Sequence, residues 1–367
     1  MRDKTLSTEE FDEKKNEAFA DRMINILNSG ALSLMISIGH RSGLFDAMRA
    51  LPPSTSKRIA DSTGLQERYV HEWLGALVTG GIISCDPGKH LFSLPPEHAS
   101  WLTRQSKANN LALFAQYIPL LGAIEDKIID CFNNGGGVPY SEYKRFHEVK
   151  AEDCIQMVVP VIIDKVLPVI PGLIDSLHRG IDVLDVGCGS GQIINSMAKF
   201  FPKSRFVGYD LSEEAIATGN DEAVKQSLSN VRFEVRDLTK FGLGENYDLI
   251  TAFDAIHDQP DPENILKEIA RILRSEGTFL MQEIAASSDI CNNTNHFIGP
   301  LLYTISCLHC MTVSLSQDGA GLGLMWGEEK TLEMLQKVGF DNVRIEKLPH
   351  DFQYAYYIMS KTCLKKI

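Results

Sequence analysis

The residues best suited to chemistry stand at 185–191, DVGCGSG, directly after an apolar strand and before a helix. Gly187, Gly189 and Gly191 let the backbone approach a ligand closely. Their spacing is G-x-G-x-G, whereas the dinucleotide fingerprint needs G-x-G-x-x-G. Asp185 precedes the first glycine, and its carboxylate would repel a pyrophosphate at the start of the helix. We therefore expect an adenosine ligand that carries a cationic amino-acid tail in place of a pyrophosphate.

Two further acids end the next two predicted strands. Asp210 follows the glycine motif, at a place where a carboxylate can accept hydrogen bonds from both ribose hydroxyls. Asp237 ends the third strand and can accept a hydrogen bond from an exocyclic amine such as that of adenine. Open α/β sheets bind ligands at the carboxyl ends of their strands, so the three acids should line one site. The apolar residues expected against the ligand are Leu211, Leu238 and Phe253.

A second group of polar residues ends the next two strands. His257 and Asp258 lie in the short loop after the fourth strand, and Glu283 ends the fifth. Histidine titrates near neutrality, so His257 is a candidate general base. Glu283 is the second candidate catalytic residue, because it could orient His257 or bind a polar acceptor. The sequence leaves two alternatives open, namely that His257 only hydrogen-bonds its loop and that Glu283 is a solvated strand end.

The elements that must position these residues follow an alternating pattern. From residue 176 onward, short apolar strands alternate with amphipathic helices, which predicts a parallel sheet covered on both faces. A short connection between the last two strands predicts a hairpin, so the last strand should be antiparallel. The fold class is therefore α/β, with a Rossmann-like sheet at 176–367.

The N-terminal part is predicted to be helical. Ser7 and Glu10 form a capping-box pattern before a helix over 8–29. Further on, a helix–turn–helix pattern over 56–79 is followed by two short strands around Asp86-Pro87-Gly88, which is typical of a winged helix. We expect three domains: a helical and winged-helix domain at 1–100, a helical linker or cap at 101–175, and the α/β domain at 176–367.

Residues 182–284 resemble the core of class I S-adenosylmethionine-dependent methyltransferases. The family's glycine motif matches 185–191, its ribose acid matches Asp210 and its adenine acid matches Asp237. The resemblance implies a seven-stranded sheet with a reversed last hairpin, and S-adenosylmethionine as the cofactor that becomes S-adenosylhomocysteine. In the plant-type O-methyltransferases the corresponding loop carries a catalytic His-Asp pair followed by Trp; here Gln259 replaces the Trp.

The winged helix ahead of this core resembles that of small-molecule O-methyltransferases and of related bacterial and invertebrate methyltransferases. The resemblance implies that this domain builds a homodimer and walls the acceptor pocket. The long connection 285–326, with an apolar helix near 297–314, is typical of a lid or substrate wall. Candidate acceptor contacts, for which core packing is the alternative, are Tyr140, Tyr143, His296, Tyr303, His309 and Trp326.

Composition argues against several other classes of protein. Lys and Arg number 36 against 48 Asp and Glu, a net charge of −12 that disfavours nucleic acid as a partner. The second helix of the helix–turn–helix, 66–79, carries one arginine and two glutamates. A DNA-binding regulator remains the main alternative to an enzyme that methylates a small-molecule O- or N-nucleophile. A silent cofactor-binding scaffold and a dehydrogenase are weaker alternatives.

Eight cysteines are too sparse for a disulfide scaffold. Cys307 and Cys310 form one CxxC in apolar surroundings, and without a second such pair we expect no metal site. The charged N-terminus is neither a signal peptide nor an anchor, and no later segment resembles a membrane span. The sequence therefore predicts a cytoplasmic protein that binds no membrane.

Overall fold

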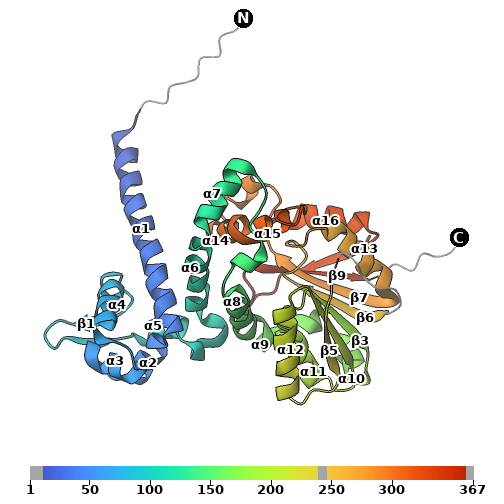
Figure 1. Ribbon diagram of the computed structural model, residues 1–367, viewed down its shortest axis with the longest axis horizontal. Coiled ribbons are helices and arrows are strands. Elements are labelled where there is room, and N and C mark those ends of the chain that lie inside the picture. The colour runs from blue at the N-terminus through green and yellow to red at the C-terminus, as the bar shows by residue number, and fades with distance from the viewer. Residues whose placement is uncertain (1–10, 239–245, 361–367) are drawn as a thin grey trace, which may run out of the picture. The chain divides into compact units, whose positions relative to one another are not determined.

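The structure is a computed structural model that describes residues 11–238 and 246–360 (Figure 1). The chain forms two compact units, Met1–Pro119 and Leu120–Ile367. The segment 101–175, expected to be a separate linker or cap, is divided between them at Pro119. Its last three quarters belong to the same unit as the α/β sheet, which matters for the site because this segment supplies several side chains to it.

The first unit opens with the long helix α1 (Glu13–Arg41), which begins at Asp12. The Asp12 carboxylate accepts hydrogen bonds from the backbone N–H groups of Lys14 and Lys15. The prediction of a helix over 8–29 was wrong at its C-terminal end, because Gly30 lies inside the helix. A single interior glycine costs only about 1 kcal/mol, which burial of the last turns offsets. Ser7 and Glu10 lie outside the described residues.

The winged helix follows as predicted. Helix α3 ends at Gly64, whose φ of +69° is a left-handed conformation suited to glycine. The antiparallel strands β1 and β2 pair Ser84 with Ser93. The buried core of this unit includes Phe45, with Trp73 packed edge-on at 5.3 Å between ring centroids. The elements are α2 (Leu44–Ala50), α3 (Ser56–Thr63), α4 (Glu67–Thr79), β1 (Ser84–Asp86), β2 (Leu91–Ser93) and α5 (Pro96–Leu102).

The second unit contains a seven-stranded sheet in the order β5-β4-β3-β6-β7-β9-β8. Strand β9 pairs antiparallel with both β7 and β8, and the other neighbours are parallel, which confirms the predicted reversed last strand. The strands are β3 (Asp182–Val186), β4 (Arg205–Asp210), β5 (Val231–Val235), β6 (Tyr247–Phe253), β7 (Leu273–Ile284), β8 (Val343–Glu346) and β9 (Tyr354–Ser360).

Two hydrophobic cores cover the two faces of this sheet. Because side chains alternate along a strand, Val183 of β3 packs into one core and the next residue, Leu184, into the other. The first face is covered by α10 (Leu173–Arg179), α11 (Gln192–Phe200) and α12 (Glu213–Lys225), and the second by α13 (Pro262–Ile272) and α16 (Gly327–Lys337). This three-layer arrangement leaves the carboxyl ends of the parallel strands at one edge (Figure 1).

Helices outside the sheet bring further residues to this unit. Before β3 lie α6 (Tyr117–Gly122), α7 (Glu125–Asn134) and α8 (Phe146–Asp153). The predicted apolar helix near 297–314 is present as α14 (Gly299–Ile305), a π-helical stretch at Ser306–Cys310 and α15 (Met311–Leu315). Stretches of π-helix within α-helices are frequent at functional sites. We call the whole run 299–315 the insertion helix.

Candidate active site

The glycine motif turns sharply between β3 and α11. All three glycines have positive φ, and a Cβ on Gly191 would lie 2.3 Å from the Phe233 ring. Gly187 is equally crowded, since its Cβ would lie 2.6 Å from that of Ala255. A Cβ on Gly189, in contrast, would meet nothing within 4 Å. The loop is therefore packed tightly on the protein side and open at Gly189, which is the geometry of a cradle for a ligand.

Asp210 at the end of β4 is tied to this cradle. Its Oδ2 accepts a hydrogen bond from the Gly189 N–H at 2.8 Å, and its Oδ1 accepts one from the Ser212 N–H at 2.9 Å. A carboxylate has about four lone-pair sites, so two backbone donors leave room for two hydroxyl donors. The neighbouring Leu211 is 58% exposed, which leaves an apolar side chain uncovered beside the carboxylate.

Asp185 near the end of β3 is a buried carboxyl group whose hydrogen-bond partner is the neutral Thr251 hydroxyl. It is 4% exposed, and one oxygen accepts a hydrogen bond from the Thr251 hydroxyl at 2.7 Å. Burial raises the pKa of Asp185 to about 7; the Thr251 hydrogen bond lowers it, and the negative charge of Asp210 raises it further. Because burial makes the ionised form of Asp185 unfavourable, a ligand that brings a positive charge next to it would stabilise the carboxylate.

We expect Asp185→Asn to stabilise the ligand-free protein above pH 7. The pKa of Asp185 lies above its unfolded value of 3.8, so the wild type loses stability as pH rises from about 4 to about 7. The amide has no such penalty and can still accept the Thr251 hydrogen bond. The gain at pH 8 is up to about 4 kcal/mol, from three pKa units. Melting temperatures of both proteins between pH 4 and 8 test this, and parallel curves would contradict it.

The remaining predicted cofactor contacts lie at the same sheet edge. Asp237 is half-buried just after β5, and Phe253 is the partly buried last residue of β6. Leu238, in contrast, is 4% exposed and belongs to the core beneath the sheet. Leu211 therefore offers more free apolar surface for an adenine ring than Leu238 does.

The structure brings His257 and Glu283 together. Glu283 Oε2 lies 2.7 Å from His257 Nδ1, and both residues are 1% exposed. Glu283 Oε1 accepts the Ile256 N–H, and Oε2 also accepts the indole N–H of Trp326 at 3.2 Å. Trp326, which was predicted as an acceptor contact, therefore hydrogen-bonds the same Glu283 carboxylate that orients His257. Because Nδ1 is engaged by Glu283, the imidazole is oriented with Nε2 facing away from that carboxylate.

The charge state of His257 follows from these contacts. Burial by itself lowers its pKa, but the Glu283 carboxylate outweighs burial and holds the pKa well above its usual value. Cys310 on the insertion helix adds a side-chain hydrogen bond to the ring. At neutral pH the imidazole is therefore charged, and it can act as a base only after it has lost that proton. Asp258, the next residue, is half-buried, and burial raises its pKa to about 6.

A second charged pair, which the sequence did not reveal, lies beside this dyad. Lys150 Nζ of α8 lies 2.6 Å from Asp254 Oδ2, and Tyr354 of β9 donates a hydrogen bond to the same oxygen at 3.1 Å. Asp254 directly follows β6 with φ +54°, a strained conformation for a non-glycine residue. Its other oxygen, Oδ1, is buried without a hydrogen-bond partner and lies 3.9 Å from His257 Nδ1. Three segments far apart in the sequence meet here, and no local pattern could have predicted it.

Asp254, His257 and Glu283 have the spacing of metal ligands, with one donor atom of each within 4.8 Å of the others. Their other contacts favour a hydrogen-bonded dyad. The Glu283 oxygens already accept from His257, Trp326 and the Ile256 backbone. The Lys150 ammonium, 2.6 Å from Asp254, occupies the place of a cation. This donor set therefore suits proton transfer better than metal binding.

The loop after α7 brings aromatic side chains to the same edge. Tyr140 hydrogen-bonds His147 Nδ1 at 3.2 Å, and His147 Nε2 lies 3.2 Å from the Ser212 hydroxyl, next to the cradle of Asp210. His147 was not predicted. Tyr143 is buried and donates its hydroxyl hydrogen bond to the Leu308 carbonyl of the insertion helix at 2.6 Å. The loop 133–143 thus connects the cofactor cradle with the insertion helix.

The other two candidate acceptor contacts lie at the start of the 285–326 segment. The Tyr303 hydroxyl accepts a hydrogen bond from Asn293 Nδ2 at 2.9 Å, which closes the segment on itself. The half-buried His296 stacks on Phe297 at 6.2 Å between ring centroids. In the described part of the chain, no hydrogen bond or ring contact joins His296 or Tyr303 to His257 or Glu283. Their roles as acceptor contacts stay predictions.

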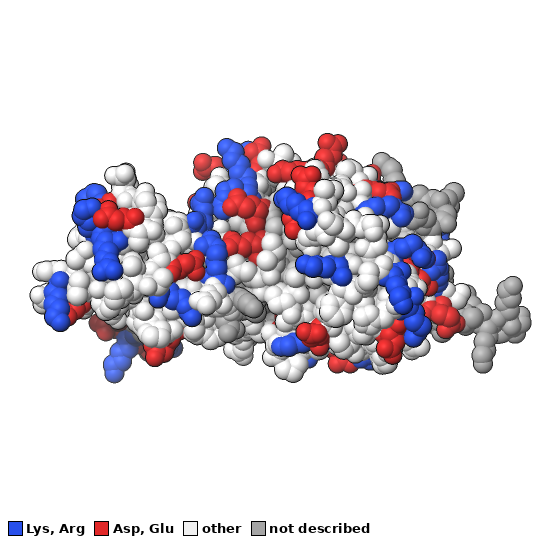
Figure 2. Space-filling model, turned by 90° about the horizontal axis from the view of Figure 1, so that it is seen from below, with Lys and Arg blue, Asp and Glu red and all other residues white. Residues whose placement is uncertain are grey.

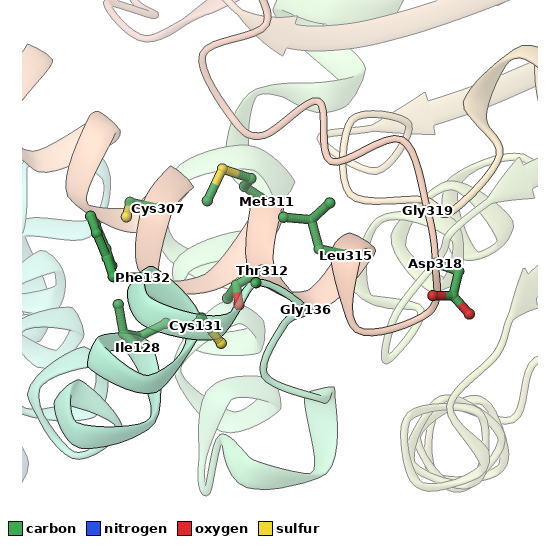
Figure 3. Close-up of a pocket in the computed structure, with 11 residues that line it drawn as sticks. Ile128, Cys131, Phe132, Gly136, Cys307, Met311, Thr312, Leu315, Asp318 and Gly319 are labelled. Carbon is green, nitrogen blue, oxygen red and sulfur yellow. The ribbon is translucent and has the colours of Figure 1, made fainter.

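A cavity of about 490 Å³ lies between α7 and the insertion helix (Figure 3). Phe132 and Ile128 of α7 face Cys307, Met311 and Leu315 across it. On another face of the same helix, Cys310 contacts His257, and the Ser314 hydroxyl donates to the Gln259 carbonyl at 3.0 Å. The insertion helix therefore separates this cavity from the dyad, and the reacting atoms do not belong in it.

Two family models match the chain. Residues 177–339 match the model described as a methyltransferase domain, and the fold and the match define a class I S-adenosylmethionine-dependent methyltransferase domain. Residues 30–104 match the model described as an Rv2258c-like winged HTH domain. The chain therefore carries a methyltransferase domain after an N-terminal winged HTH domain.

Two curated relatives match over less than a third of the chain. The chain is 29% identical over 100 residues to the malonyl-[acyl-carrier protein] O-methyltransferase of Bacillus cereus, covering 27% of this chain and 36% of that protein. It is 31% identical over 109 residues to the ubiquinone biosynthesis O-methyltransferase of Coxiella burnetii, covering 29% of this chain and 44% of that protein. The chain thus spans less than half the length of these relatives. The match therefore does not assign the acceptor of either relative to this chain.

Solved structures match over nearly the whole chain. Human N-acetylserotonin methyltransferase in complex with S-adenosylmethionine has a TM-score of 0.68 at 18% identity, covering 98% of this chain and 100% of that chain. An O-methyltransferase family protein from Burkholderia thailandensis has a TM-score of 0.68 at 14% identity, covering 94% and 99%. At these identities the likeness establishes the fold of both units.

Proposed function

We propose that this protein transfers a methyl group from S-adenosylmethionine to an oxygen or nitrogen of a small-molecule acceptor. The observation that carries this proposal is the His257–Glu283 dyad, buried at the same sheet edge as the Asp185 and Asp210 carboxylates. A cofactor site and a proton-accepting site within one unit are what methylation of a protonated nucleophile needs.

The residues present fit the cofactor. The open space at Gly189 and the two oxygens of Asp210 suit a ribose, and the buried Asp185, with its raised pKa, suits the cationic amino-acid part. Leu211 would lie against the adenine, with Asp237 near its amine. When bound, the cofactor supplies a methyl group already activated by the positive charge of its sulfur.

The chain's own residues then have two tasks. Glu283 fixes the ring of His257, so that the imidazole, once it has lost its proton, can take the proton of an acceptor hydroxyl or amine. The insertion helix contacts the dyad through Cys310, and Tyr143 of the loop 133–143 is hydrogen-bonded to that helix, so that together they can hold the acceptor in place and exclude water. Orientation of this kind can contribute several kcal/mol to the rate, up to about 7–11 kcal/mol in favourable systems.

Two measurements test the proposal. Calorimetry with S-adenosylhomocysteine and with NAD should show heat only with the first, which separates a methyltransferase from a dehydrogenase. Incubation with methyl-labelled cofactor and a small-molecule extract should then yield a labelled product that names the acceptor. Binding without any labelled product would instead support a scaffold that only holds the cofactor.

The surface gives little support to a DNA-binding role. On the face shown in Figure 2, basic and acidic side chains are interspersed, with no continuous basic field. In the helix–turn–helix, Lys57 pairs with Asp61 at 2.9 Å, and Arg68 pairs with Glu72. Helix α4 buries Val70, Trp73, Leu74 and Leu77 in the core of its own unit. Charges that are already paired with acids are poor ligands for phosphates.

We also propose that α1 mediates a homodimer. Its apolar side chains are largely uncovered, with Phe19 at 59% and Leu27 at 68% exposure. An exposed apolar patch of this kind marks an interaction surface. By length and composition α1 is also able to span a membrane, and it is the one single helix among the described residues that is. The sequence predicted no membrane-spanning segment. In a homodimer, the exposed apolar face of α1 would pack against the same apolar face of the second copy.

We expect the double variant Phe19→Glu and Leu27→Glu to be monomeric in analytical ultracentrifugation, because charges on both sides of the interface repel. Tyr69→Glu is the matched control, since Tyr69 on α4 is 79% exposed but lies outside α1. A wild type that sediments as a monomer without detergent would refute the dimer. A wild type that floats with lipid vesicles would favour the membrane alternative.

A further inference from the structure

His309, near the middle of the insertion helix, is the most unusual polar residue of the second unit. Its side chain is 1% exposed, yet neither Nδ1 nor Nε2 has a hydrogen-bond partner. A buried polar nitrogen without a partner is costly, and native structures leave few of them. A ring with two such nitrogens calls for a ligand or another explanation.

The ring is held firmly in one orientation. It stacks on Phe146 with a centroid distance of 3.6 Å and an interplanar angle of 5°. Tyr140 and Tyr143 pack edge-on at 5.5 Å and 4.7 Å. These three aromatic residues come from the loop after α7 and from α8, so distant parts of the chain cooperate to fix this imidazole. An imidazole fixed in this way is suited to recognising a polar group of a ligand by hydrogen bonding.

The ring also lies at the catalytic edge. The next residue, Cys310, hydrogen-bonds His257, and the charges of His257, Lys150 and Asp254 all act on His309. Burial lowers the pKa of His309 to about 3, and the positive charges of His257 and Lys150 lower it further. The imidazole is therefore neutral at physiological pH, with one nitrogen that donates a hydrogen bond and one that accepts.

We propose that His309 determines acceptor specificity by hydrogen-bonding an uncharged polar group of the acceptor. This inference rests on the proposed function and names the class of acceptor. The acceptor carries two polar groups: the nucleophile that faces His257, and a hydroxyl, carbonyl or amide that faces His309. The group is assigned as uncharged because the neutral ring offers one hydrogen-bond donor and one acceptor but no positive charge to pair with a carboxylate.

Three variants separate this role from a structural one. His309→Phe keeps the stack on Phe146 and removes both nitrogens, and His309→Gln restores hydrogen bonding. His178→Phe is the matched control: His178 of α10 also packs against an aromatic ring, Phe201 at 4.9 Å, but precedes β3 at the opposite edge of the sheet. Each protein is incubated with methyl-labelled cofactor and the same small-molecule extract, and its affinity for S-adenosylhomocysteine and its melting temperature are measured.

We expect His309→Phe to lower the yield of labelled product by about 10- to 100-fold, as one lost hydrogen bond implies. S-adenosylhomocysteine affinity should stay unchanged, and the melting temperature should be equal or higher, because two unpartnered nitrogens are gone. His309→Gln should recover part of the yield, and His178→Phe should match the wild type. The product should carry an uncharged polar group besides the methylated atom.

Several results would overturn this role of His309. They are an unchanged yield in His309→Phe, a loss matched by an equal loss of S-adenosylhomocysteine affinity, or a product whose only polar group is the methylated one. Failure of the proposed function looks different, because it appears in the wild type as absent S-adenosylhomocysteine binding or absent labelled product. In that case the role of His309 falls with it.

Discussion

Asp210→Ala is expected to weaken S-adenosylhomocysteine binding by at least about 100-fold. The substitution removes the carboxylate proposed to accept both ribose hydroxyls, and each hydrogen bond to a charged group contributes about 1.5–3 kcal/mol. It also removes the partner of the Gly189 N–H, which holds the cradle in shape. Titration calorimetry on purified protein measures the effect directly.

Two control variants distinguish a loss of ligand binding from a loss of folding. Asp221→Ala removes an exposed carboxylate from α12, on the element that follows Asp210, and should bind like the wild type. Asp210→Asn keeps one oxygen acceptor and should lose less affinity than Asp210→Ala. If Asp210→Ala melts like the wild type and still binds within a few-fold, the ligand does not lie at this sheet edge.

His257→Ala is expected to lower kcat by about 10²- to 10⁴-fold, the usual contribution of a general base, while S-adenosylhomocysteine affinity is retained. Removal of the ring leaves the buried Glu283 carboxylate without its closest partner, so folding itself is at risk. His257→Gln avoids this problem, because its amide can still donate to Glu283. Unchanged turnover in a folded variant would remove His257 from the mechanism.

The pH dependence of turnover gives an independent measure of the same dyad. Because Glu283 raises the pKa of His257, turnover should rise with pH through an apparent pKa above 6.5. Glu283→Gln removes the negative charge, so this rising limb should move to lower pH while kcat falls from lost orientation. A limb that stays in place would show that another group titrates.

Much of the fold could be predicted from local patterns. The alternation of apolar strands with amphipathic helices specified the three layers, and the short 349–353 connection predicted the reversed β9. The end of α1 could not be predicted, because one interior glycine is a weak signal against burial of the last turns. The positions of Asp185, Asp210 and Asp237 followed from topology alone, since parallel strands end at one edge.

Other features of the site depend on chain segments that meet only in three dimensions. The sequence named His257 and Glu283 but could not decide whether they touch; the register that pairs β6 with β7 places them 2.7 Å apart. Lys150 and His147 show no periodic or motif signal, because their roles come from contacts with residues more than 50 positions away. The sequence named His309 as a candidate acceptor contact but could not show that its ring lies near His257 and Lys150. The raised pKa of Asp185 and of His257 likewise arises from burial and from neighbouring charge, which only tertiary packing creates.

The amino-acid sequence by itself thus determined the class of fold, the glycine cradle and the acids at the strand ends, because backbone conformation and strand polarity are encoded locally. The tertiary structure decided which of the polar residues work together and which hydrogen-bond partners each histidine has. Hydrogen-bond partners, burial and electrostatic fields depend on distances between segments that no linear spacing specifies.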